Sequence, residues 1–346
     1  MDSDTIHNRR NVLKSTVGLV GAGIIAGCTG SGSEGDDTEF PSDDIEVIIP
    51  FGPGGGYDAY GRLTAEHLSD RVSVDARADN VEGAGGQIGA EEVFNSTDPY
   101  TILLADLSDF TLMQITEDVD YDMTEFTPYP RIASSTPCIA VTKESDFDDL
   151  EDVINAVQNE RVRWGSTSLT GVRTTLPLTL GELGGAYDVE NVYGNFIMTD
   201  SFGDIITGMQ QEDIEVVASA YSSTLPYVGD DGPLEMLFVG IMDDSPPEAT
   251  PNAQTFSDVD VDNAQDIIDL VSSQRIFMGP PDTPESVAEQ MGTLLSDTIT
   301  SEELQQQAEE IDRPISHADS SEIEEVVRNS FDLWEEYEYL LDDIGQ

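Results

Sequence analysis

The chain has 346 residues, enough for two domains with their own cores, and its hydrophobic content of 38% is adequate for folding. Its 70 acidic residues stand against 14 lysines and arginines, which gives a formal charge of −56 at pH 7. This balance excludes nucleic acid as a partner, because phosphate backbones are bound by basic patches.

The acidic residues are spread along the whole chain and do not form a single acidic tail. In dilute buffer, such self-repulsion destabilises a compact state. In molar salt the Debye length falls to about 3 Å, and the repulsion is screened. The composition therefore predicts a halophilic protein, of the haloarchaeal type, that folds in brine.

The N-terminus has the order of segments found in an exported lipoprotein. Arg9 and Arg10 precede an apolar run at 17–26, which glycines interrupt and which is too short for a comfortable membrane span. Small residues then lead to Cys28 in the sequence IAGC, a pattern typical of a cysteine that receives lipid on its thiol. We therefore predict a twin-arginine signal peptide at 1–27, with core packing around a lone cysteine as the alternative.

A buried strand, a glycine loop and a helix are expected at residues 45–68. Four of the five residues at 45–49 are β-branched, as in the central strands of an α/β sheet. Three consecutive glycines follow at 54–56, and they let the backbone approach a ligand closely. The first N–H groups of the helix lack intrahelical partners and face this loop. The pattern therefore predicts an anion site.

Strand-like and helix-like runs alternate over the rest of the chain. Strands are expected at 72–76, 101–105, 139–142, 162–164, 214–219 and 237–241, and helices at 147–157, 172–183, 284–295, 302–311 and 321–341. Glycine turns at 83–86 and 165–171 also precede helices. The alternation predicts an α/β fold with parallel sheets, in which ligands bind outside the carboxyl ends of the strands.

The glycine loop has three interpretations. Gly54-x-Gly56-x-x-Ala59 fits a dinucleotide fingerprint, and Asp75 lies near the expected distance after it, so an NAD-dependent Rossmann oxidoreductase is the first. An exported protein has no obvious supply of nicotinamide, however. The second is a tight turn with no ligand, but three glycine loops that each precede a helix are not explained by it. The third is a carboxylate-binding cleft built from helix N-termini.

Longer stretches of sequence favour the third interpretation. The run PFGPGGGYDAYGRL at 50–63, followed by NVEGAGGQIGAE at 80–91, resembles the opening of the substrate-binding proteins of tripartite tricarboxylate transporters, the TctC or Bug family. The resemblance continues in the right order at 121–141, 181–219, 251–258 and 277–284. It implies a type II periplasmic-binding-protein fold of two α/β lobes with a ligand cleft between them. It also implies an extracytoplasmic solute-binding protein for a tricarboxylate, dicarboxylate or similar organic acid.

The predicted organisation follows from this resemblance. After the signal peptide, we expect a flexible acidic tether at 28–40, a first lobe at 41–138 plus 240–346, and a second lobe at 139–239. The implied partners are a small organic carboxylate and the integral membrane permease subunits. We expect a monomer, held by its lipid anchor at the extracytoplasmic face of the cell membrane. A ligand-sensing or structural surface lipoprotein with no transport role is the alternative.

Candidate ligand contacts come from both lobes. Carried over to this chain, the family's loops point to Gly55, Gly56, Tyr57 and Asp58 in the first lobe and to Ser166, Thr167 and Ser168 in the second; Gly86, Arg173 and Tyr193 complete the predicted set. Family members commonly have Thr or Ser where Tyr57 stands, so the contact there is expected to differ. The lysine of the family pattern near Tyr193 is missing, and Arg173 is expected either to supply a cation or to pair with a neighbouring acid.

No catalytic or metal-binding set is predicted. His67 and His317 are far apart in the sequence, and no Cys/His spacing suits a metal. Thr167 stands where a serine elbow would place its nucleophile. Cys138 lies in an apolar run and is expected to be buried and inert. The sequence therefore predicts no enzyme, cofactor or metal.

Overall fold

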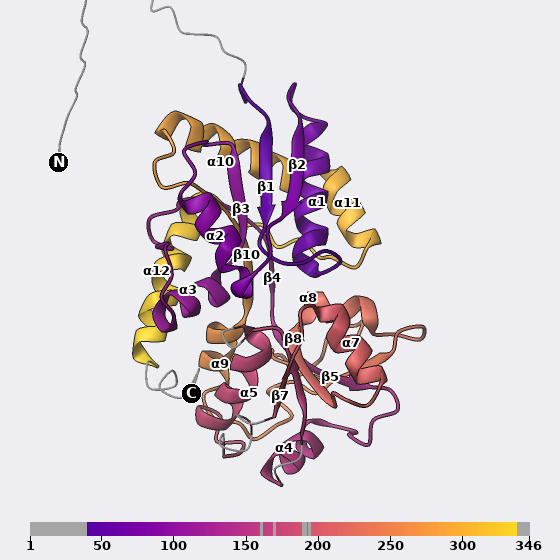
Figure 1. The fold of residues 1–346 in the computed structure, drawn as a ribbon. Coiled ribbons are helices and arrows are strands. Elements are labelled where there is room, and N and C mark those ends of the chain that lie inside the picture. The colour runs from indigo at the N-terminus through magenta and orange to yellow at the C-terminus, as the bar shows by residue number, and fades with distance from the viewer. Residues whose placement is uncertain (1–39, 160–161, 169–170, 189–191, 193–194, 338–346) are drawn as a thin grey trace, which may run out of the picture. The chain divides into compact units, whose positions relative to one another are not determined.

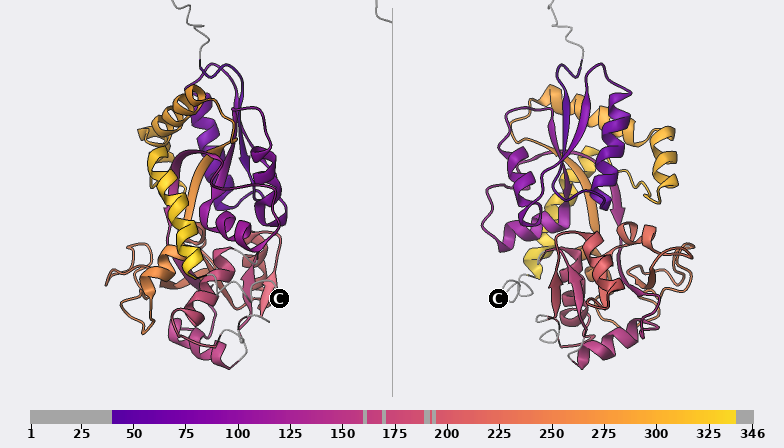
Figure 2. Two further views of the ribbon diagram at one scale, coloured as in Figure 1. Left: turned by 90° about the vertical axis from the view of Figure 1, so that its left-hand side faces the viewer. Right: turned by 45° about the vertical axis from the view of Figure 1, so that its right-hand side comes forward.

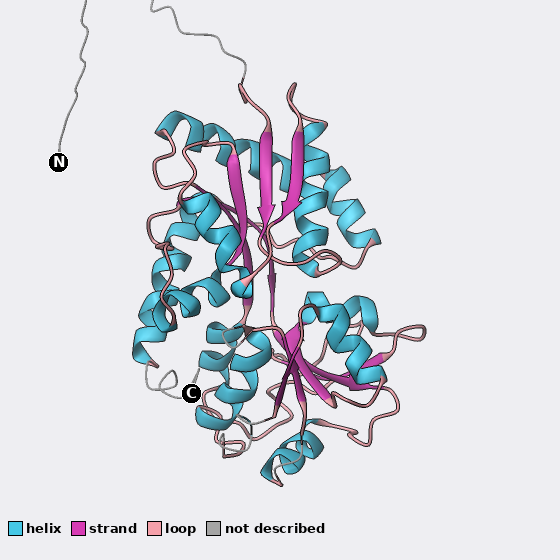
Figure 3. Ribbon diagram, in the orientation of Figure 1, coloured by secondary structure: helices cyan, strands magenta, loops and turns pink. Residues whose placement is uncertain are grey.

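The computed structural model describes residues 40–159, 162–168, 171–188, 192 and 195–337 (Figure 1). The predicted export and lipid sites Arg9, Arg10 and Cys28 and the predicted ligand contact Tyr193 lie outside these residues. Two mixed five-stranded sheets, each covered by helices, form the framework (Figure 3). Among the described helices, none combines the length and the apolar character that a membrane span requires.

The first sheet has the strand order β2-β1-β3-β10-β4. Its strands are β1 (Ile45–Ile49), β2 (Ala76–Asn80), β3 (Thr101–Asp106), β4 (Thr127–Ser135) and β10 (Ser273–Gly279). Strand β1 runs parallel to β2 and β3, whereas β10 is antiparallel to β3 and β4. The central strands β1 and β3 are almost entirely buried, as expected where helices cover both faces of a sheet.

Alternate residues of these strands pack against two groups of helices. Val47 and Ile102 face one group, α1 (Gly56–Ser69) and α10 (Glu285–Ile299), and α11 (Glu302–Glu310) packs beside them. Ile48 and Leu103 face the other group, α2 (Gln87–Phe94), α3 (Leu107–Thr116) and α12 (Ser320–Glu336). The two-residue period of the strands thus builds two cores, one on each side of the sheet.

The second sheet has the order β7-β6-β8-β5-β9. Its strands are β5 (Pro137–Thr142), β6 (Trp164–Ser166), β7 (Phe196–Met198), β8 (Val216–Ala220) and β9 (Leu234–Val239). One face packs against α4 (Leu150–Gln158), α5 (Val172–Glu182) and α9 (Ala264–Val271), and the other against α7 (Phe202–Gln210). The short helix α8 (Tyr221–Thr224) and the 3-10 turn η2 (Leu225–Tyr227) follow β8.

The chain passes between the two sheets at neighbouring places (Figures 1 and 2). Strand β4 of the first sheet ends at Ser135, and β5 of the second begins at Pro137. The return runs from α9 into β10, where Ser273 pairs with Ser135. Because α9 packs in the core of the second sheet, that lobe reaches beyond the predicted limit at residue 239.

One predicted strand is displaced. The apolar pattern favoured 72–76, whereas the strand lies at Ala76–Asn80, paired with β1 from Ala76 opposite Ile45. This edge strand alternates between half-buried and exposed positions, so its sequence carries little of the apolar signal of a central strand. Its place is set by pairing with β1, which no local pattern reveals.

Candidate ligand-binding site

A cavity of ≈ 670 Å³ lies between elements of both lobes. The first lobe contributes the glycine loop after β1, the 3-10 turn η1 (Ala84–Gly86) before α2, and a residue of α3. The second lobe contributes the turn after β6, the start of α7 and residues after β8. The cavity therefore lies at the carboxyl ends of β1, β6 and β8, as the α/β pattern predicted.

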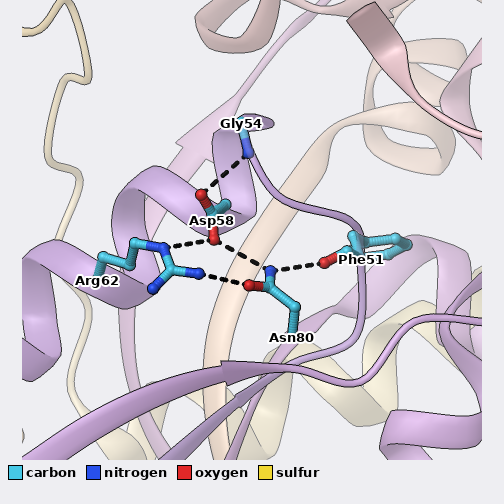
Figure 4. A network of polar contacts seen from close by, with 5 residues as sticks. All are labelled: Phe51, Gly54, Asp58, Arg62 and Asn80. Atoms are coloured by element: carbon cyan, nitrogen blue, oxygen red, sulfur yellow. Dashed lines mark hydrogen bonds and ion pairs between the residues drawn. The ribbon is translucent and has the colours of Figure 1, made fainter. Parts of the chain in front are cut away.

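A hydrogen-bond network holds the glycine loop in shape (Figure 4). Asp58 accepts hydrogen bonds from the Gly54 N–H (3.0 Å), from Arg62 Nε (2.8 Å) and from Asn80 Nδ2 (3.0 Å). Asn80 Nδ2 also donates to the carbonyl oxygen of Phe51 at 2.9 Å. Asp58 is buried and does not line the cavity, which differs from its predicted role as a ligand contact. Its carboxylate fixes the backbone that presents the loop.

The glycine N-cap of α1 leaves the first N–H groups of that helix available at the cavity. Gly55 precedes α1 and Gly86 precedes α2, and neither position can supply a capping side chain. Both residues line the cavity, together with the predicted contact Gly56. An anion in the cavity would take the place of the missing cap of α1. At α2, the Gly86 N–H donates to the Gly83 carbonyl oxygen at 2.9 Å and the Gln87 N–H to that of Ala84.

Tyr57 lines the cavity, and its hydroxyl is bonded to residues of β3 and β10. The hydroxyl donates to Asp106 and lies 3.1 Å from Ser273 Oγ. The ring centroid is 4.5 Å from that of Phe51, and the Arg275 guanidinium lies 4.9 Å from it. The phenol therefore joins the glycine loop to β3 and β10, and a small hydroxyl at this position could not span that distance.

A buried polar network continues from Asp106 toward the second lobe. Asp106 caps α3 through the N–H groups of Ser108 (3.1 Å) and Asp109 (3.3 Å), and it accepts a 2.5 Å hydrogen bond from Ser273 Oγ. Burial raises the pKa of Asp106, although Ser273 and the nearby Arg275 lower it.

Arg275 links β10 to α8 across the lobes. Its guanidinium is fully buried and donates to Ser222 Oγ (3.0 Å) and Ser223 Oγ (2.9 Å). Ser223 lines the cavity, and Arg275 lies behind it. Arg275 thus places a positive charge beneath the cavity wall near the first turn of α1.

The residues of the predicted turn in the second lobe have two different roles. Thr167 and Ser168 line the cavity. Ser166 is fully buried, and its hydroxyl donates to the Ser168 carbonyl oxygen (2.8 Å) and lies 2.9 Å from Thr174 Oγ1. Ser166 therefore shapes the turn, whereas its two neighbours are placed to touch a ligand.

Arg173 supplies the cationic side chain in the described lining of the cavity. Its Nη1 donates to Thr167 Oγ1 at 3.3 Å, and its guanidinium carbon lies 4.8 Å from the centroid of the Phe202 ring. Its Nε has no hydrogen-bond partner among the described residues, and none of their carboxylates forms an ion pair with it. The ion pair with a neighbouring acid, which was the alternative expected from the sequence, is thus not seen among the described residues. Arg173 retains donors for a ligand.

Several residues that line the cavity were not predicted from the sequence. Asp109 on α3, the segment 199–203 before and at the start of α7, Ser223 and Tyr227 all line the cavity. Asp109 follows closely on β3, and Ser201 caps α7 through the Asp204 N–H, so strand-end and capping patterns were the available signals.

The structure also places the cysteine, the fingerprint acid and the possible metal ligands that the sequence singled out. Cys138 is buried as expected, and burial raises the pKa of its thiol to about 12. Asp75, the acid that a dinucleotide fingerprint would use, is exposed and does not line the cavity. Within the described ranges, no group of three or more His, Cys, Asp or Glu side chains could hold a metal ion.

Comparisons with known proteins match nearly the whole described chain. The sequence model of the family described as "Tripartite tricarboxylate transporter family receptor" matches residues 61–336. A UPF0065 protein from the tcbD-tcbE intergenic region of Pseudomonas sp. (strain P51) is 26% identical over 211 residues, which cover 59% of this chain and 62% of that protein. The matched segment therefore spans less than two thirds of this relative.

Two solved structures from Rhodopseudomonas palustris share the fold. Rpa4515 with adipate gives a TM-score of 0.74 at 18% identity, covering 88% of this chain and 98% of the other. MatC (Rpa3494) with bound malate gives 0.73 at 15% identity, covering 88% and 100%. The periplasmic-binding-protein fold predicted from the sequence is confirmed.

Proposed function

The chain belongs to the tripartite tricarboxylate transporter receptor family, and from this membership we propose that it is an extracytoplasmic receptor for a small organic carboxylate. The carboxylate would bind in the cavity between the lobes and pass to the integral membrane permease subunits of a tripartite transporter. We assign the chain no enzymatic reaction. The very acidic composition supports a receptor that works in brine.

One observation carries this proposal: the cavity offers hydrogen-bond donors to an anion from both lobes. In the first lobe these are the N–H groups at the glycine-capped start of α1. In the second lobe they are the hydroxyl group of Thr167 and the guanidinium of Arg173, and Ser168 lines the cavity beside them. Neutral N–H donors bind an anion without many cations, which suits a chain with so few basic residues. The adipate and malate named for the two Rhodopseudomonas structures support the same ligand class.

The same arrangement explains how ligand binding would close the lobes. A ligand can shift a conformational equilibrium only by the difference between its affinities for the two states. A carboxylic acid that reaches the glycine loop and Arg173 at once contacts both lobes only when they are together. Closure around the ligand would then follow as a hinge motion at the two chain passages beside Ser135 and Ser273.

The first test is ligand binding in molar salt. A panel of mono-, di- and tricarboxylates should contain a compound that raises the unfolding temperature, because a ligand at a hundred times its Kd adds about 2.7 kcal/mol to the free energy of unfolding. Arg173→Gln should weaken binding of that compound roughly tenfold to a hundredfold, since a donor to a charged group is lost. Arg328→Gln removes an exposed arginine on α12 and serves as the control.

NAD and NADP are added to the same panel, because they test the alternative function of an oxidoreductase. A stabilising shift with NAD or NADP, and none with any carboxylate, would replace the receptor by an oxidoreductase. If no compound of either kind gave a shift, a structural surface lipoprotein would be the better interpretation.

The proposed anchor has its own test. We propose that Cys28 carries lipid after twin-arginine export directed by Arg9 and Arg10. Expressed in a halophilic host, Cys28→Ser should move the protein from the membrane fraction to the medium. Cys138→Ser changes the buried thiol and should leave the protein in the membrane fraction. Retention of the Cys28→Ser variant in the membrane would contradict the anchor.

A further inference from the structure

Asp109 places a carboxylate of the first lobe against a helix of the second. It lies in the first turn of α3 and lines the cavity. One of its oxygens is 3.1 Å from the position that a Cβ would take at Gly171, the N-cap of α5. The backbone N–H of Val172, the first residue of α5, acts to lower the pKa of this carboxyl. Glycine at 171 thus leaves room for a contact between the lobes that a side chain would crowd.

This contact changes where a ligand anion can bind. The N-terminus of α5 would attract a carboxylate, but the Asp109 carboxylate already lies beside its N-cap. The ligand carboxylate is therefore directed to the glycine cap of α1 and to Arg173, whose Nε lacks a partner in the described chain. Asp109 then lies beside the bound anion.

The charges around Asp109 favour a donor on the ligand. Asp106 caps the same helix, and Arg173 and Arg275 lie on α5 and β10. Burial and the charge of Asp106 raise the pKa of Asp109 well above its usual range, against the effect of the two arginines. A carboxylate has about four lone-pair sites, and closure removes the water that could satisfy them. Leaving the buried oxygens of Asp109 without a donor is unfavourable, and placing the ligand carboxylate beside them without a donor is more so.

We propose that the ligand carries a hydrogen-bond donor, an ammonium or a hydroxyl group, on the carbon next to its carboxylate, and that Asp109 accepts from this donor. The inference rests on the proposed function, because it assumes that a carboxylate occupies the cavity. Arg173 then binds the carboxylate of the ligand, and Asp109 binds the donor group on the neighbouring carbon. The substrate class is an amino acid or hydroxy acid, and plain carboxylic acids are discriminated against.

The test compares acids that differ only in this group. Two five-carbon sets serve as probes: glutarate, 2-hydroxyglutarate and glutamate; and pentanoate, 2-hydroxypentanoate and 2-aminopentanoate. Calorimetric titration in molar salt should show that at least one donor-bearing acid binds roughly tenfold to a hundredfold more tightly than its unsubstituted parent. A preference for the amino acid over the hydroxy acid identifies an ammonium group as the donor.

Variants assign the preference to Asp109. Asp109→Asn keeps a side-chain oxygen and a similar shape, but it loses the negative charge, so the preference for the amino acid should fall at least fivefold. Asp109→Ala removes the acceptor, and the preference for the hydroxy acid should also fall. Glu117→Gln removes an exposed carboxylate at the other end of α3 and should leave the ratios as in the wild type. Circular dichroism and thermal unfolding check that each variant is folded.

The outcomes separate this inference from the proposed function. Unsubstituted acids that bind as tightly as their donor-bearing counterparts would overturn the inference and leave the carboxylate receptor standing. A preference that survives in both Asp109 variants would overturn the role of Asp109. If these probes and the broader carboxylate panel all fail to bind, the proposed function falls, and the inference falls with it.

Discussion

Valine in place of Gly56 should abolish ligand binding and leave the protein folded. Gly56 is the first residue of α1, and a Cβ there would lie 2.9 Å from Ser223 Oγ and 3.6 Å from the Arg275 guanidinium. Ser223 belongs to the second lobe, so a branched side chain would hold the lobes apart or displace the loop from its network. The expected loss of affinity is roughly a hundredfold or more.

The measurement is calorimetric titration of the best ligand from the panel, in molar salt, with thermal unfolding as a check on folding. Gly55→Ala is the matched comparison, because its Cβ would come no closer than 3.8 Å to the Gly52 carbonyl oxygen and its N–H is kept. That variant should stay within about threefold of the wild-type affinity. Wild-type affinity in Gly56→Val would remove this loop from the site.

Alanine in place of Asp106 should lower the free energy of unfolding by about 2–4 kcal/mol at neutral pH. The variant loses the cap of α3, and it leaves the hydroxyls of Tyr57 and Ser273 without their shared acceptor. Because burial raises the pKa of Asp106, the wild-type carboxyl stabilises the fold most below its ordinary pKa and less as pH rises through the raised value. The deficit of the variant should therefore widen on acidification.

Denaturant unfolding in molar salt at several pH values measures this effect. Asp149→Ala is the control, since Asp149 caps α4 through the Asp152 N–H; about 1 kcal/mol is expected from that cap alone. Equal deficits in the two variants would show that the hydroxyl pair contributes nothing. A larger deficit for Asp106→Ala assigns the difference to the junction of the glycine loop with β10.

The parts of the fold that the sequence predicted are those with strong local patterns. Strands β1 and β3 are buried and apolar throughout, and α4 begins at a capping aspartate. The edge strand β2 was displaced because its position depends on pairing with β1. The extent of the second lobe was missed because α9 joins that core from far along the chain.

Some features of the candidate site were also predictable from the sequence, and others were not. The glycine loops were predictable, since consecutive glycines before a helix let the backbone turn tightly and approach a ligand. The roles of Asp58 and Ser166 were not, because the same residue types serve equally well to hold a turn and to touch a ligand. Asp109 was missed because its importance comes from α5, which the chain reaches only after crossing to the other lobe.

The reliance on backbone N–H donors has a kinetic consequence. The field of a helix terminus fades within a short distance, whereas the net charge of −56 acts over the whole Debye length. An approaching anion is therefore repelled by the surface before it feels the donors inside the cavity. Added salt shortens that repulsion, so the association rate for an anionic ligand should rise with ionic strength, the reverse of ordinary electrostatic steering. Brine would then serve both to keep the chain folded and to let its ligand enter.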